Sequence, residues 1–300
     1  MTKFNPKVGK RYKLATNLST ILAPNASAMT YRGTNTYLLG NRDVAVIDPG
    51  PPDEDHLNAI LNALDAHQRI SHVLVTHSHI DHSPLAMVLA QITGSRVHAF
   101  GPSSAGRSPI MDSFGDLGGG EGIDETFIPD VALSHGDILT GTDWSIEALH
   151  TPGHMGNHMC FSWREGRALF SGDLVMGWAT SMVSPPDGSL TDFMSSLEML
   201  NEREDEDVFY PGHGAPVVTP KERVTALLDH RRKRESQILA RLNHGPALPK
   251  DIAAAIYDDL DPALLPAAER NVLAHLIDLT QKSIVTPEGT LSSNTFFKLK

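Results

Sequence analysis

The chain has 300 residues, 40% of them apolar and 20% charged, with a formal net charge of −11. This composition is globular, and the length suits one large domain or one large domain with a small appendage. The acidity argues against a protein that coats nucleic acid or anionic membranes non-specifically. Cys160 is the only cysteine, which excludes an internal disulfide and predicts a cytoplasmic location. No apolar run approaches the roughly 20 residues that span a bilayer, so we expect no membrane partner.

Strand and helix patterns alternate over the first hundred residues. Short apolar runs predict strands, and apolar residues at helical spacing predict helices. Ser83 is expected to cap the second helix, with Pro84 in its first turn. The predicted strands cover 34–40, 43–50, 71–77 and 96–100, and the predicted helices cover 54–66 and 83–93. This alternation is typical of α/β layering.

The second half of the chain changes character twice. Residues 101–130 are irregular and glycine-rich, which fits either a flexible lid or a plain surface loop. The predicted strands then cover 137–140, 144–151, 158–163 and 167–173, and the predicted helices cover 220–242, 248–260 and 265–285, followed by a terminal strand pair. We therefore expect an α/β domain over 1–218 and a small helical domain over 219–300.

The stretch "LVTHSHIDHSPLA" (74–86) places His77, His79, Asp81 and His82 within six positions directly after an apolar strand. Imidazole and carboxylate groups are ligands of divalent transition metals. A catalytic zinc ion takes about four ligands, one of which is water. Four ligands so close in sequence cannot all surround one ion, but they can begin two adjacent sites.

Three further turns carry residues of the ligand type: His154 follows a predicted strand in "TPGH", Asp173 ends a predicted strand in "SGD", and His213 lies between two glycines in "PGHG". Glycine and proline allow the sharp bends that bring backbone close to a bound ion. The remaining histidines are interpreted as surface or packing residues, and Cys160 as a small core residue. These histidines are His56, His67, His72, His98, His135, His150, His230, His244 and His275.

Two other residues have open roles. Asp48 in "VIDPG" either accepts a hydrogen bond from a ligand histidine or is a turn residue. His158 either orients a ligand or touches the substrate.

The motifs "THSHIDH", "TPGH", "SGD" and "PGHG" resemble, in order, those of the metallo-β-lactamase-fold hydrolase superfamily. The resemblance implies a four-layer αββα sandwich with two metal ions at one edge. It implies one ion held by His77, His79 and His154 and a second held by Asp81, His82 and His213. It also implies that Asp173 bridges the ions, which we expect to be zinc, with manganese or iron as alternatives.

The resemblance also bears on function. Asp81 is expected to act in catalysis as well as in metal binding. The class B lactamases use a cysteine at the second metal, whereas Cys160 lies outside the motifs here. Antibiotic hydrolysis is therefore not expected. The C-terminal part, with "HRRKRE" on a long helix, is similar to the β-lactamase-like protein 2 branch, which has a small winged-helix-like domain.

The substrate is less constrained than the chemistry. Residues 230–236, "HRRKRES", form a basic island with Arg223, Arg241 and Lys250 in an acidic chain. Such an island either holds phosphates or is a solvated helix face. We favour a phosphodiester such as single-stranded RNA, with a thioester hydrolase of the hydroxyacylglutathione hydrolase type as the alternative. A flavo-di-iron redox module is disfavoured because His79 stands where that type has glutamate. A small-molecule or RNA substrate and a homodimer are the expected partners.

Overall fold

The computed structural model describes residues 4–120, 122–258 and 260–300. Two sheets form its centre, one of seven strands and one of five. The first sheet follows chain order. Its strands are β1 (Arg11–Ala15), β2 (Leu18–Leu22), β3 (Asn35–Leu39), β4 (Asp43–Ile47), β5 (Arg69–Leu74), β6 (Arg96–Ala99) and β7 (Val131–Ala132). Strands β1 to β4 pair antiparallel and β4 to β7 pair parallel.

The second sheet has the order β12-β11-β10-β9-β8 and is antiparallel except for the β11–β12 pair. Its strands are β8 (Ile138–Thr140), β9 (Ser145–His150), β10 (Met159–Trp163), β11 (Ala168–Gly172) and β12 (Val208–Pro211). Four helices accompany the two sheets. They are α1 (Glu54–Asn62), α2 (Leu85–Thr93), α3 (Leu190–Glu202) and α4 (Pro220–Leu242).

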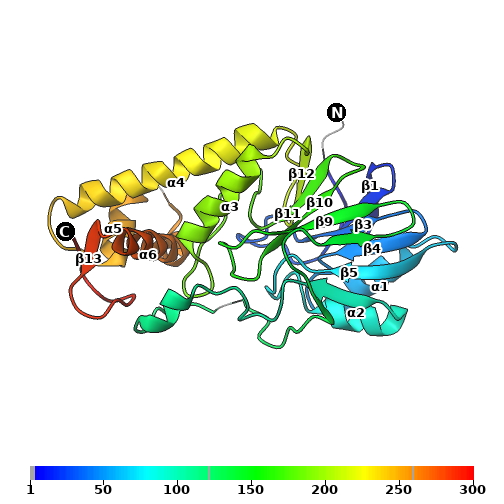
Figure 1. Ribbon diagram of the computed structural model, residues 1–300, viewed down its shortest axis with the longest axis horizontal. Coiled ribbons are helices and arrows are strands. Elements are labelled where there is room, and N and C mark those ends of the chain that lie inside the picture. The colour runs from blue at the N-terminus through cyan, green and yellow to red at the C-terminus, as the bar shows by residue number, and fades with distance from the viewer. Residues whose placement is uncertain (1–3, 121, 259) are drawn as a thin grey trace.

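Strand alternation builds the four layers. In β4, Ala45 and Ile47 face the second sheet, while Val44 and Val46 pack with residues of α1 and α2. In β10, Phe161 faces the first sheet and Cys160 packs with α3 and α4. Successive strand residues point to opposite faces, so strands buried on both sides read as continuous apolar runs. Figure 1 shows α1 and α2 on one side of the sheets and α3 on the other. The expected αββα sandwich is confirmed.

A third body of structure follows at the C-terminus. It contains α5 (Pro249–Ile256), the 3₁₀ helix η2 (Pro262–Leu264), α6 (Leu265–Gln281), and a small antiparallel sheet of β13 (Val285–Pro287) and β14 (Phe297–Leu299). These elements share a core of their own with the C-terminal end of α4. Figure 1 shows them at the end of the molecule away from the seven-stranded and five-stranded sheets.

Helix α4 belongs to both cores. Its early stripe, Val224, Leu227 and Leu228, packs against the second sheet and α3. Its later stripe, Ile238 and Leu242, packs in the C-terminal core. The apolar stripe of this helix is therefore buried in one core at its start and in the other at its end. The division into 1–218 and 219–300 stays a prediction, because one continuous helix joins the two cores.

Residues 101–130 connect the same two parts of the molecule. They include the 3₁₀ helix η1 (Pro109–Ser113), and Met111 and Leu117 are buried in the C-terminal core, whereas Phe127 is buried beneath the first sheet. The Gly115 N–H donates to the Leu291 carbonyl over 2.8 Å. A plain surface loop would not bury such side chains, so that interpretation is wrong.

Several element boundaries differ from the sequence prediction. Helix α2 begins at Leu85 with Pro84 at the N-cap position and no side-chain cap. Ser83 instead donates to the carbonyl of His79 and to Asp124, so its predicted capping role is wrong. Helices α1 and α6 end four residues before their predicted ends. Strands β1, β2, β7 and β12 and helix α3 were not predicted, whereas the terminal strand pair is confirmed.

Candidate metal centre

The seven predicted ligands lie on loops that follow strands. His77, His79, Asp81 and His82 follow β5, His154 follows β9, Asp173 follows β11 and His213 follows β12. The structure brings these loops together, and the seven side chains form three overlapping groups whose candidate ligand atoms lie within 4.8 Å of one another. The groups are His77, His79 and His154; His77, His82 and Asp173; and Asp81, His82 and His213.

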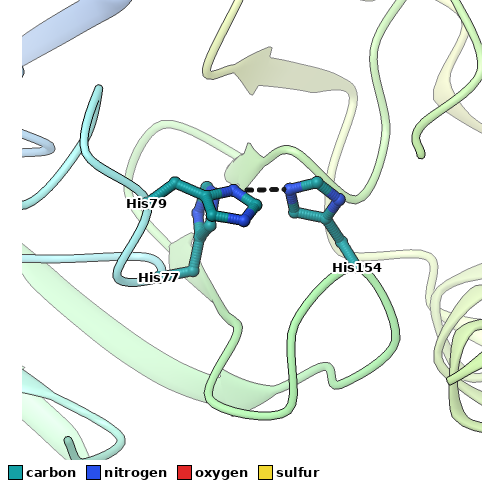
Figure 2. A group of neighbouring side chains, drawn as sticks. All are labelled: His77, His79 and His154. Atoms are coloured by element: carbon teal, nitrogen blue, oxygen red, sulfur yellow. Dashed lines mark hydrogen bonds between the residues drawn. The ribbon is translucent and has the colours of Figure 1, made fainter. Parts of the chain in front are cut away.

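The first group consists of imidazoles only. Nε2 of His77 and Nε2 of His154 each lie 3.0 Å from Nδ1 of His79. Figure 2 shows the rings of His79 and His154 opposite each other with His77 beside them, and the planes of the first two rings are 80° apart. Nδ1 of His154 lies 2.7 Å from the Met182 carbonyl. That bond places the proton on Nδ1 and leaves the Nε2 lone pair free for a ligand role.

The other two groups combine imidazoles with carboxylates. Nε2 of His213 lies 3.2 Å from Asp81 and 3.3 Å from Asp173. Nε2 of His82 lies 3.4 Å from Asp81 and 3.6 Å from Asp173. Nε2 of His82 and Oδ1 of Asp173 are buried without a hydrogen-bond partner. Buried polar atoms normally have partners, so these two atoms are free to bind a cation.

Asp48 positions one of the ligand candidates. Its carboxylate accepts hydrogen bonds from the Thr76 N–H and hydroxyl, both over 2.8 Å, and from Nδ1 of His82 over 3.0 Å. The last bond fixes the His82 ring so that Nε2 points toward Asp81 and Asp173. Asp48 itself has a positive φ of 51°, which is uncommon for a residue with a side chain. The geometry matches the histidine-orienting interpretation of Asp48.

His158 lies behind Asp173 and does not line the cavity at the site. Its Nε2 accepts from the Asp173 N–H over 3.2 Å, and its Nδ1 bonds to the Thr151 hydroxyl over 3.0 Å. These contacts match the orienting interpretation of His158. They do not match contact with substrate.

Glycine at two motif positions is required by close approach. A Cβ atom at Gly172 would lie 2.6 Å from Nε2 of His158, and φ there is 47°. A Cβ atom at Gly212 would lie 2.4 Å from Oδ1 of Asp173 and 2.6 Å from Cε1 of His82. These distances are below any normal contact, so the "SGD" and "PGHG" turns need glycine to place their ligand candidates.

The electrostatics of the group are strongly coupled. Burial opposes a charge on His82, but the carboxylates of Asp81, Asp173 and Asp48 outweigh it and raise the pKa of His82. Burial likewise opposes a charge on His213, yet Asp173 and Asp81 raise its pKa to about 9. Burial and the neighbouring His154 lower the pKa of His79 to about 3. Without a bound cation, protons on His82 and His213 balance the negative charge of the carboxylates, a role that a metal ion would otherwise take.

A cavity of about 680 Å³ opens from the site toward the C-terminal elements. At the site it is lined by His79, Asp81, His154, Asp173 and His213. Beyond the site it is lined mainly by apolar side chains. The larger of these are Met29, Met176, Trp178, Met182, Tyr257, Leu260 and Leu264. Trp178 stacks on Tyr31 with ring centroids 5.0 Å apart.

Sequence reasoning did not predict the residues of this cavity. Met29 and Trp178 stand on loops without a motif, and Tyr257 and Leu264 belong to elements distant in sequence. His230, interpreted as a surface or packing residue, lines the cavity although it belongs to none of the three groups. Cys160 is fully buried in the core as predicted, where burial raises the pKa of its thiol to about 12.

The model of the metallo-beta-lactamase superfamily matches residues 29–213, and that of the beta-lactamase-associated winged helix domain matches residues 249–292. The chain belongs to the metallo-β-lactamase superfamily. Its members are metal-dependent hydrolases, and this chain is an enzyme of that kind. The expected winged-helix C-terminal domain is likewise confirmed.

Similar proteins extend this assignment. The chain is 32% identical over 285 residues to the Beta-lactamase-like protein 2 homolog of Drosophila melanogaster, covering 90% of each chain. It is 30% identical over 244 residues to an Atrochrysone carboxyl ACP thioesterase of Aspergillus terreus, covering 79% of this chain and 67% of that protein. A beta-lactamase domain protein from Burkholderia ambifaria has the same fold, with a TM-score of 0.82 at 19% identity, covering 100% of this chain and 96% of the other.

The predicted likeness to β-lactamase-like protein 2 is thus confirmed. Among the described residues, no helix is both long enough and apolar enough to cross a membrane.

Proposed function

We propose that this superfamily member binds two divalent metal ions and hydrolyses acyl thioesters. His77, His79 and His154 would hold one ion, Asp81, His82 and His213 the other, and Asp173 would lie between them. The donor set supports this assignment because it combines neutral imidazoles with carboxylates and contains no thiolate, a combination that suits zinc, manganese or iron. The unpartnered Nε2 of His82 and Oδ1 of Asp173 are the atoms that such ions would satisfy.

When bound, such a metal pair lowers the pKa of a water molecule and polarises the electrophilic oxygen. The protein supplies the remaining steps. Asp81 holds its carboxylate at the cavity wall, where the Thr34 hydroxyl donates to Oδ2 over 3.2 Å. Burial opposes its ionised form, but His82 and His213 hold the pKa of Asp81 well below its usual value. The ionised carboxylate can orient the attacking water, accept its proton at Oδ and return that proton to the leaving thiolate.

The side chains that line the cavity are the main reason for preferring a thioester substrate. It begins at the metal-site residues and continues between methionine, tryptophan, tyrosine and leucine side chains. Such a mainly apolar surface suits an acyl chain. The thioesterase named among the relatives supports the same choice. The order of preference from sequence alone is therefore reversed.

A phosphodiesterase is the second candidate, and one observation favours it. Arg232 and Lys233 are exposed on α4 and can meet a phosphate from solvent. Arg232 is, however, within 3.5 Å of Glu198 and Asp229. Arg223, another residue of the island, donates to the carbonyls of Met176 and Ala179 and thereby supports the cavity wall. The island is therefore not one free cationic surface.

A side-by-side assay tests the proposal. Wild-type enzyme reconstituted with zinc would be assayed on a hexanoyl thioester of N-acetylcysteamine, S-lactoylglutathione, bis(p-nitrophenyl) phosphate and a single-stranded RNA oligonucleotide. We expect the highest kcat/KM on one of the thioesters. The Asp81→Asn variant serves as the control for a contaminating hydrolase. A higher kcat/KM on RNA than on either thioester would overturn the proposal.

A further inference from the structure

One wall of the cavity differs from the apolar rest. Helix α4 contributes His230, Arg231 and Arg234 to it. His230 and Arg234 are four residues apart and so share a face of the helix. Arg231 is buried, with 3% of its surface exposed, and lies at the back of this wall. The three residues come from the conspicuous basic run of the sequence, but they face inward.

The two arginines have only neutral partners. Arg231 donates to Asn271 Oδ1 over 2.9 Å and to the Ser181 carbonyl, and its guanidinium lies 5.0 Å from the centre of the Phe193 ring. Arg234 donates to the Ile256 carbonyl over 2.8 Å and lies 4.0 Å from the centre of the Tyr257 ring. In the part of the chain that the structure describes, no carboxylate pairs with either arginine within 4.0 Å.

Carboxylates near these arginines form ion pairs with other cationic side chains. Asp278 lies 2.7 Å and Glu235 lies 3.8 Å from Nζ of Lys282. The Thr191 hydroxyl also donates to Asp278 over 2.7 Å. The carboxylates of Asp229 and Glu198 lie beside Arg232. This arrangement leaves the positive charge of the wall uncompensated, which is costly in a medium that screens weakly.

Several donor atoms of the wall lack partners as well. Nδ1 of His230 and Nε of both Arg231 and Arg234 are buried without a hydrogen bond. Burial, followed by the adjacent Arg231 and Arg234, lowers the pKa of His230 to about 4. Burial also lowers the pKa of Arg231 to about 10. Burial is the main cause of both shifts, and the positive charge of Arg234 lowers both pKa values further.

We infer that this wall binds an anionic group of the substrate, a carboxylate or a phosphate, at a point remote from the bond that is hydrolysed. Arg234 and His230 contact the anion, and Arg231 contributes its charge from behind the wall. The apolar side chains then hold the segment that joins the anion to the reacting carbonyl. This inference rests on the proposed function and narrows it to thioesters whose acyl or thiol part carries a negative charge.

Calorimetric binding to the full-length enzyme tests the inference without any turnover. The probes are hexanoate and hexylphosphonate, with hexanamide as the neutral probe of similar length. We expect at least one anion to bind about ten- to a hundredfold more tightly than the amide, as a hydrogen bond to a charged group requires. The tighter anion identifies the group as carboxylate-like or phosphate-like.

Variants locate the binding. His230→Leu and Arg234→Gln should lower anion affinity about tenfold or more, and Arg232→Gln, on the exposed face of the same helix, should leave it unchanged. Because Arg234 also bonds to Ile256, Arg234→Lys serves as the variant that retains the charge and should retain most of the binding. Melting temperatures check that every variant is folded.

The inference is overturned if neither anion binds more tightly than hexanamide. It is also overturned if His230→Leu and Arg234→Gln both bind the anion as tightly as the wild-type enzyme does, which would place the anion elsewhere, for instance at the metals. If anion affinity changes in the variants as predicted but the wild-type enzyme does not hydrolyse thioesters, the proposed function is refuted and the anion site is retained.

Discussion

The metal-site loops and helix α4 each carry a dense run of polar residues in the sequence, but the fold places the two runs differently. The cluster from His77 to His82 and the separate His154, Asp173 and His213 meet in three overlapping groups. The basic run on α4 separates instead, with Arg231 and Arg234 facing the cavity and Arg232 and Lys233 facing solvent.

The difference follows from backbone geometry. A loop at a strand end leaves the sheet at its edge, and adjacent strand ends bring their loops to one place. Successive residues on a helix point about 100° apart, so a run of charges cannot share one direction. Clustering in sequence therefore predicts a site when it stands at strand ends. On a helix, a cluster in sequence predicts only that some of the charged side chains face the protein interior and others face solvent.

The largest expected effect comes from the metal-site loops. Asp81→Asn should lower kcat by about 10²- to 10⁴-fold, because it removes the carboxylate proposed to move the proton. Steady-state kinetics on the best thioester measures the loss. Asp55→Asn, an exposed carboxylate on α1, is the matched control and should behave as wild type. An Asp81→Asn variant with more than a tenth of wild-type kcat, roughly, would exclude the proton-transfer role.

The next largest effect is expected for Asp48, which accepts a hydrogen bond from the ligand candidate His82. Asp48→Ala removes the acceptor that orients His82 and should weaken metal binding about 10- to 100-fold. Competition with a fluorescent chelator would measure the affinity at fixed pH. If the affinity is unchanged, Asp48 serves only the turn before Pro49.

Two glycines differ in the space around them and so give a sharper test of packing: a Cβ atom would clash at Gly212 but would fit at Gly177. Gly212→Ala places a methyl group against Asp173 and His82, and should lower kcat about tenfold or more by displacing these ligands. Gly177→Ala, whose Cβ would have its nearest neighbour at 3.4 Å, is the matched control. Equal kinetics for the two variants would mean that the ligand positions tolerate the displacement.

The seven ligand candidates, the sandwich and the winged-helix end could be anticipated from the sequence because each has a local signal. The cavity could not, because Met29, Trp178 and Tyr257 come together only through tertiary packing. The same reason applies to short strands such as β7 and β12, which exist by pairing with strands distant in sequence. Ser83 failed as a predicted cap because its hydroxyl is used by His79 and Asp124.

The smallest expected effect lies on the outer face of α4. A double variant, Arg232→Gln with Lys233→Gln, should change kcat/KM on thioesters by no more than about twofold, since exposed substitutions rarely exceed 0.5 kcal/mol or so. Activity would be compared at low and high salt. A large loss of RNA cleavage in this variant, together with a weaker salt dependence than that of the wild-type enzyme, would restore the phosphodiester hypothesis. A protein that makes fewer phosphate contacts releases fewer counterions when it binds RNA, so its binding depends less on salt.

Metal content tests the central claim most directly. Elemental analysis of wild-type enzyme, purified and reconstituted with zinc, should give two ions per chain, because the three ligand groups together exceed what one tetrahedral ion can use. His154→Ala should lose one of them, and His230→Leu, which lies outside the groups, should keep both. One ion or none in the reconstituted wild-type enzyme, or equal losses in both variants, would contradict the account.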